Sequence, residues 1–75
     1  MEPENIIIQI QDSLLAQFLL YWLETDKPCS LLFQSPRTDK ISAITFIKTT
    51  ISSIEAKEFL SLVREKTGCR LLKVS

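Results

Sequence analysis

The residues best suited to chemistry gather in one short segment, Ser35-Pro36-Arg37-Thr38-Asp39-Lys40, which carries two cations and two hydroxyl groups. Cationic side chains beside hydroxyls can bind a phosphate or the carboxylates of an acidic partner. Arg37 and Lys40 are therefore candidate anion contacts, and Arg70 and Lys73 near the other end of the chain belong to the same basic set. Because a turn between strands also carries charges simply through exposure, the segment alone does not define a site.

Residues for acid–base or metal chemistry are poorly represented. The chain has no histidine, so proton transfer would fall to carboxylates, lysines or cysteines. Its two cysteines, Cys29 and Cys69, form neither a C-x₂-C zinc pair nor the larger set typical of a disulfide-stapled domain. We therefore predict no enzyme activity, no catalytic residue, no metal and no cofactor. The same cysteine usage predicts structural thiols and a cytoplasmic protein.

Charge is balanced overall but uneven along the chain. The 75 residues hold nine basic and nine acidic side chains. Residues 1–34 have five acidic residues against one basic, a net charge of −4, whereas the chain from Ser35 onward has eight basic against four acidic, a net charge of +4. This asymmetry predicts two solvated faces of opposite sign, and a basic surface for nucleic acid or phosphate is the alternative.

Length and hydropathy predict one small domain, residues 1–75, without a membrane span. Residues 5–23 contain a single formal charge, Asp12, but polar residues interrupt the segment and it lacks about 20 continuous apolar positions. The opening MEPEN has no basic region of the kind that begins a secretory signal. A chain of this size buries only about 60% of its unfolded surface, so association would stabilise it.

The N-terminal third has two interpretations. Residues 5–11, NIIIQIQ, alternate apolar and polar positions with many β-branched side chains, which predicts a strand. Asp12 would then be the N-cap of a helix from Ser13 to about Glu24. The alternative is a single helix over residues 4–25, because Glu2-Pro3-Glu4 is also a plausible helix start.

The remaining elements follow from turn and capping signals. Residues 29–34 and 41–50 predict a β-hairpin with a polar loop over 35–40. Ser52 and Glu55 have the spacing of a capping box, and Gly68 is suited to end the helix that follows. The apolar positions of that helix form an inward stripe: Ala56, Phe59, Leu60 and Val63. A last strand is expected over residues 69–74.

The order is then βαββαβ, which resembles the ferredoxin-like arrangement: a two-layer α+β sandwich with both helices on one face of an antiparallel sheet. The alternative with one long helix gives αββαβ and a three-stranded sheet. The ferredoxin-like order places the strands at 29–34 and 69–74 at opposite edges, which argues against a disulfide between Cys29 and Cys69. Nucleic-acid readers of this shape present aromatic residues on the central strands, and here only Phe46 qualifies, so nucleic acid is disfavoured as a partner.

The segment SLLAQFLLYWLE, residues 13–24, is apolar almost all the way round. A helix on a two-layer sandwich needs fewer apolar positions than this, unless a small core uses them all. The surplus predicts an interface formed by Leu15, Phe18, Leu19, Tyr21 and Trp22. The favoured function is therefore a non-catalytic protein–protein interaction or regulatory module, either a homodimer or a binder of another protein, with no small-molecule substrate.

Overall fold

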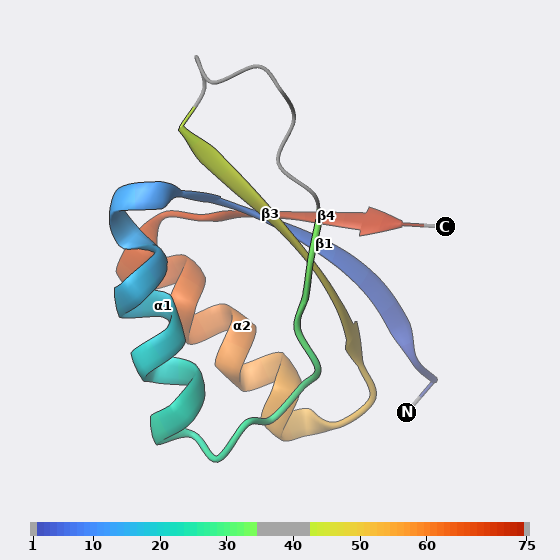
Figure 1. The fold of residues 1–75 in the computed structure, drawn as a ribbon. Helices are drawn as coiled ribbons and strands as arrows, with labels where there is room; N and C mark the ends of the chain where they lie inside the picture. The colour runs from blue at the N-terminus through green and yellow to red at the C-terminus, as the bar shows by residue number, and fades with distance from the viewer. Residues whose placement is uncertain (1, 35–42, 75) are drawn as a thin grey trace.

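The computed structural model describes residues 2–34 and 43–74, which form six elements (Figure 1). In chain order they are β1 (Glu4–Gln11), α1 (Asp12–Glu24), β2 (Leu32–Phe33), β3 (Ile44–Ile51), α2 (Ile54–Thr67) and β4 (Arg70–Val74). The predicted loop at 35–40, with Arg37 and Lys40, lies outside the described residues. The element order βαββαβ agrees with the sequence-based prediction.

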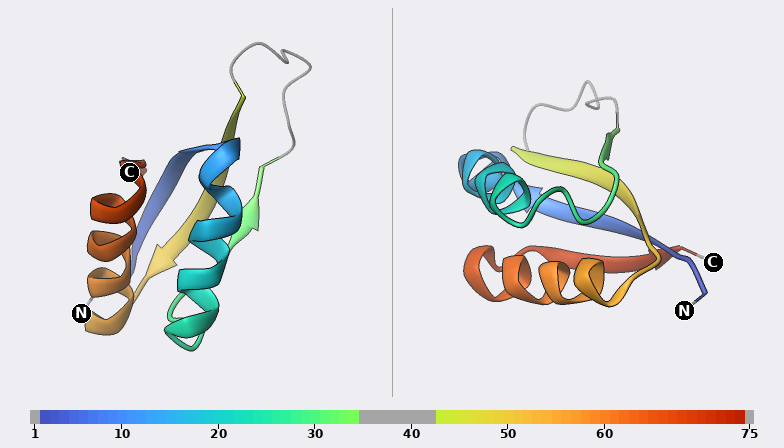
Figure 2. Two further views of the ribbon diagram at one scale, coloured as in Figure 1. Left: turned by 90° about the vertical axis from the view of Figure 1, so that its left-hand side faces the viewer. Right: turned by 90° about the horizontal axis from the view of Figure 1, so that it is seen from below.

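The strands form one four-stranded sheet in the order β2-β3-β1-β4. Every neighbouring pair is antiparallel, and β3 and β4 therefore run in the same direction on either side of β1. Both helices lie side by side on one face of this sheet (Figure 2). The protein is thus a small α+β fold in two layers, with the opposite face of the sheet uncovered by any described element.

Alternation along β1 decides which side chains enter the core. Ile6, Ile8 and Ile10 are buried under the helices, and Ile7 and Gln9 point to the opposite face. The long-helix alternative for residues 4–25 is therefore wrong: β-branched residues at every second position suit a pleated strand whose two faces differ in burial. The core is completed by residues from the other elements: Phe18, Cys29, Ile47, Ile51, Ala56, Phe59, Leu60, Val63 and Cys69.

The start of α1 differs from the predicted cap. Asp12 is the first residue of the helix, and Gln11 occupies the N-cap position without a side-chain hydrogen bond. Asp12 instead connects to the beginning of β3: its backbone N–H donates to the Ala43 carbonyl at 2.9 Å, and its carboxylate accepts from the Thr45 hydroxyl. The carboxylate still lies in the first turn, where the helix dipole favours it.

The cap of α2 is also shifted, by one residue. Ser53, not Ser52, is the N-cap, and its hydroxyl accepts from the Ala56 backbone N–H at 3.1 Å. Since the residue three positions after Ser53 is an alanine, the predicted reciprocal bond from Glu55 has no counterpart here. The other α2 predictions are confirmed: the inward stripe is buried, and Gly68 ends the helix with φ of 70°.

The predicted strand 29–34 is the least accurate element, because its register with β3 covers only Leu32 and Phe33, followed by one bond from the Gln34 N–H to the Phe46 carbonyl at 3.0 Å. The preceding residues turn toward the helices: Cys29 is buried, and its carbonyl accepts from the indole N–H of Trp22 at 2.7 Å. The chain turns toward this position at Asp26 and Lys27, which have consecutive positive φ angles of 64° and 52°. The carbonyl of Cys29 is therefore bonded to a side chain of α1 and not to a neighbouring strand.

Candidate functional site

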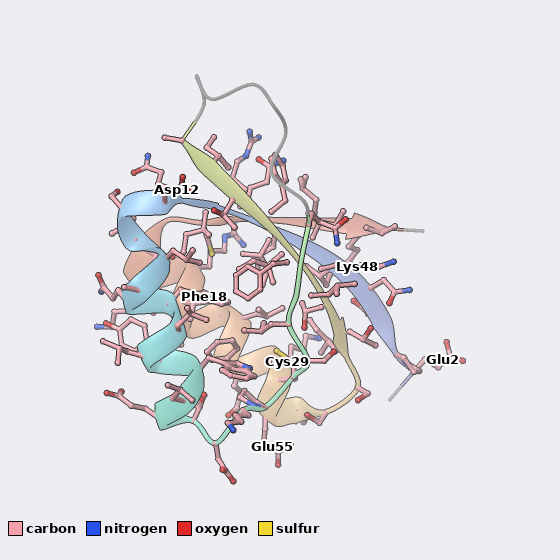
Figure 3. All side chains as sticks on the ribbon, viewed as in Figure 1. Glu2, Asp12, Phe18, Cys29, Lys48 and Glu55 are labelled. Atoms are coloured by element: carbon pink, nitrogen blue, oxygen red, sulfur yellow. The ribbon has the colours of Figure 1, made fainter. Side chains whose placement is uncertain are left out.

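The predicted interface residues of α1 are mostly turned toward the protein interior. Phe18 is fully buried between α1 and the sheet (Figure 3), and its ring meets Phe59 edge to face with centroids 5.6 Å apart. Phe18 therefore has no exposed surface available to a partner in this structure. The other four predicted residues are partly buried against the core: Leu15, Leu19, Tyr21 and Trp22. Their role in an interface stays a prediction.

The exposed apolar side chains of α1 lie on a different stripe of the helix. Leu20 is 59% exposed and Leu23 is 54% exposed. Ala16 and Glu24 are exposed beside them, at the spacing of three and four residues that places side chains on one helix face. We call these four residues the α1 ridge. The surplus apolar character of the segment thus reduces to a narrow stripe once the core contacts are counted.

A larger apolar surface lies on the uncovered face of the sheet. The register pairs Leu32 with Lys48 and Ile7 with both Lys48 and Leu72, so these side chains form one row across all four strands. We call this surface the open sheet face. Its apolar members come from every strand: Ile7, Leu32, Ile44, Phe46, Leu72 and Val74. Four of the large exposed hydrophobic residues of the described chain belong to it: Leu32, Ile44, Leu72 and Val74.

The charge of the open sheet face is entirely positive among the described residues. Lys48 projects on the side of the sheet away from the helices (Figure 3), and the register places Arg70 on the same side, opposite Gln9. No described strand position on this face is a carboxylate. The sequence grouped Arg70 with Lys73, but Lys73 pairs with buried Ile6 and so belongs to the helix-covered side.

The buried residues Cys29 and Thr49 lie close together in the core, where their thiol and hydroxyl are candidates for a nucleophilic site. Burial raises the pKa of the Cys29 thiol, and the Thr49 hydroxyl, which can donate to a thiolate, offsets part of that rise. Within the described residues the Thr49 Oγ1 atom is buried without a hydrogen-bond partner. Both cysteines are free thiols, as predicted, although Cys29 lies in the segment before β2 and not on the sheet edge itself. A buried thiol with a raised pKa is a poor nucleophile.

Other surface features are shallow. One open depression lies along the outer side of α2 and is lined by Ile54, Lys57, Glu58, Ser61, Leu62 and Glu65, all from that one helix. Within residues 2–34 and 43–74 no three His, Cys, Asp or Glu side chains group as metal ligands would. In the same part of the chain no helix is long and apolar enough to cross a membrane.

The open sheet face could have been found from the sequence with one further step. Alternation in β1 and β3 assigns Ile7, Phe46 and Lys48 to the side opposite the buried isoleucines, and that assignment needs no structure. What the sequence does not contain is the register, which brings Leu32 and Leu72 into the same row as Ile7. The sequence signal for this face was therefore the presence of apolar residues, such as Ile7 and Phe46, at strand positions that point away from the core.

Comparison with known proteins gives no relative: no family model matches the chain, and no curated protein and no solved structure matches it either. The candidate surfaces therefore rest on geometry and charge alone.

Proposed function

We propose that this protein is a non-catalytic interaction module that associates with copies of itself. The observation that carries the proposal is the placement of its exposed large apolar side chains, most of which gather on the α1 ridge and the open sheet face. Contiguous apolar patches on a small chain are typical of protein–protein contact surfaces. The partly buried α1 residues predicted from the sequence, Leu15, Leu19, Tyr21 and Trp22, stay part of the proposed interface.

The proposal includes a ferredoxin-like fold and a cytoplasmic location. The fold assignment is supported by the βαββαβ element order together with the sheet order β2-β3-β1-β4. The location is supported by two buried cysteines that are both free thiols, which suits a reducing compartment. A regulatory or adaptor role is compatible with this fold, because function on such scaffolds depends on the surface and not on the topology.

The test is light scattering on a size-exclusion column over about a hundredfold range of protein concentration. We expect the mass to rise above the 8.6 kDa of one chain as concentration increases. A mass that stays at one chain throughout the range would contradict self-association. Circular dichroism on the same samples would establish that the protein is folded at each concentration.

Single-stranded nucleic acid is a second candidate, favoured by one observation: Phe46, Lys48 and Arg70 share the open sheet face without a carboxylate among its described positions. An aromatic ring beside cations can stack a base and neutralise its phosphate. Binding would then fall steeply as salt rises, because counterions are released. Fluorescence anisotropy with labelled oligonucleotides at low salt tests it, and no change in anisotropy would exclude this role.

A further inference from the structure

The two apolar patches of this protein differ in charge. α1 contains two carboxylates, Asp12 and Glu24, and no cation over its whole length, and no basic residue lies in its last turn. The C-terminal end of a helix also carries partial negative charge. The open sheet face has Lys48 and Arg70 and no carboxylate among its described positions. One patch is therefore apolar and acidic, and the other is apolar and basic.

Like-with-like contacts would bring equal charges together. A two-fold contact between two open sheet faces would place both copies of Lys48 and Arg70 in one interface without a carboxylate from the described strands to neutralise them. A two-fold contact between two α1 ridges would bring the carboxylates of both helices to one interface, with no cation supplied by either α1. Buried charges without partners cost several kcal/mol in real proteins, so both symmetric arrangements are disfavoured.

The remaining arrangement matches apolar to apolar and acid to base. Resting on the proposed self-association, we infer that the α1 ridge of one copy docks on the open sheet face of the next, head to tail. Leu20 and Leu23 then contact the row formed by Leu32, Ile7 and Leu72. Glu24 at the end of the ridge faces the cations of the sheet.

The dimensions of the two patches are compatible. The ridge covers residues 16–24 of α1 and is therefore about 13 Å long, and four strands span about 14 Å between the outer ones. A specific interface buries at least about 600 Å² on each partner. That is about a tenth of the 5512 Å² accessible surface of the chain.

A head-to-tail contact leaves one free ridge and one free sheet face on every assembly that does not close into a ring. Mass should therefore rise beyond that of a dimer as concentration increases, and addition of salt should lower it, because screening weakens contacts between opposite charges. A symmetric contact between like-charged faces would respond in the opposite way and would stop at the dimer.

The decisive experiment uses two complementary variants. The ridge variant is Leu20→Gln with Leu23→Gln, which removes both apolar side chains without adding a charge, at exposed helix positions that tolerate glutamine. The sheet variant is Lys48→Glu with Arg70→Glu, at exposed strand positions. We expect each variant alone to associate at least roughly tenfold more weakly than the wild type. Their equimolar mixture should form a 1:1 dimer, because each supplies the patch that the other has lost.

Matched controls change the same charges elsewhere. Lys57→Glu with Lys66→Glu reverses two cations on α2, and Ile54→Gln replaces an apolar side chain that is 61% exposed. Both control variants should associate like the wild type. Circular dichroism and urea unfolding of every variant would show that folding is retained, so that loss of association is not caused by loss of structure.

The outcomes separate the inference from the proposed function. A wild-type chain that remains monomeric overturns both, and the two patches would then be available to other partners. A wild-type chain that associates while either variant alone still does so overturns the head-to-tail contact only, since one patch would then suffice. Failure of the mixed variants to form a dimer, with wild-type association intact, also overturns it.

Discussion

Trp22→Phe removes one hydrogen bond while keeping an aromatic ring in place. The indole N–H of Trp22 donates to the Cys29 carbonyl at 2.7 Å, and this bond attaches the segment after α1 to the helix. Phenylalanine has no donor, so the carbonyl would lose its partner in a partly buried environment. The bond also lies beside Lys27, whose ammonium is 5.9 Å from the centre of the Trp22 ring.

The expected cost follows from these contacts. A neutral hydrogen bond contributes about 0.5–1.5 kcal/mol, and a buried acceptor left without a partner costs about 1–3 kcal/mol. The smaller ring also leaves part of its site empty. Because the bond is only partly buried, we expect the free energy of unfolding to fall by about 2 kcal/mol, near the lower end of the combined range. In a domain of this size that corresponds to a urea midpoint roughly 2 M lower, at a slope of about 1 kcal/mol per molar.

Urea unfolding followed by far-ultraviolet circular dichroism is the appropriate assay, because the variant lacks the only tryptophan of the chain. Tyr21→Phe is a matched control: it removes a hydroxyl from the same helix, whose only described bond is an exposed one from Gln17 at 3.1 Å. The control should stay within about 0.5 kcal/mol of the wild type. Equal urea midpoints for Trp22→Phe and the wild type would refute the assigned role of the indole.

Three further predictions concern single sites. Thr49→Val should raise the free energy of unfolding by about 1 kcal/mol, because it removes a buried hydroxyl without a partner. The control Thr50→Val breaks an exposed bond to Asn5 and should not raise the free energy of unfolding in the same urea titration. Burial raises the pKa of the Cys29 thiol, so the unfolded chain loses this proton at a lower pH than the folded chain. The free energy of unfolding should therefore fall as pH rises above about 9, and Cys29→Ala should reduce that alkaline decline in unfolding curves measured from pH 7 to 11. Gly68→Ala should lower the thermal midpoint by several degrees, since φ is 70° there, and Gly68→Asn should lower it less.

Each of these predictions has a contrary outcome. A Thr49→Val variant less stable than the wild type would mean that its hydroxyl has a bonding partner, such as the neighbouring Cys29 thiol or a buried water. An alkaline decline that is unchanged in Cys29→Ala would assign it to other groups. No neighbouring atom lies within 4 Å of the carbon that Gly68→Ala adds, so the expected cost comes from the positive φ. An unaltered midpoint would therefore mean that the end of α2 adopts another backbone conformation.

The elements with a strong local pattern could be predicted from the sequence. Alternation of isoleucine and polar residues defines β1, and the three- and four-residue spacing of Ala56, Phe59, Leu60 and Val63 defines α2 with its buried stripe. These patterns reflect burial on one face, which the structure reproduces. Strand order followed from the element order, since the two helical crossovers leave few ways to arrange four strands.

Predictions failed where a nonlocal bond competes with a local one. Asp12 has the residue type of an N-cap, yet its carboxylate bonds to Thr45, a residue 33 positions away. The segment 29–34 has the composition of a strand, yet the Cys29 carbonyl is taken by Trp22. The apolar surplus of α1 was overestimated for the same reason: segment 28–31, whose position the sequence does not indicate, packs against the same core.

The pairing of β1 with β3 has a consequence for the order in which the chain can fold. Gln11 pairs with Ile44, and Glu4 pairs with Ile51, so the two central strands meet only across long stretches of chain. Contacts of this kind require closure of a large loop before they stabilise anything, which slows folding relative to a helical bundle of equal size. During synthesis β1 can therefore pair with β3 only after β3 has left the ribosome, and β4 pairs last, with the other edge of β1.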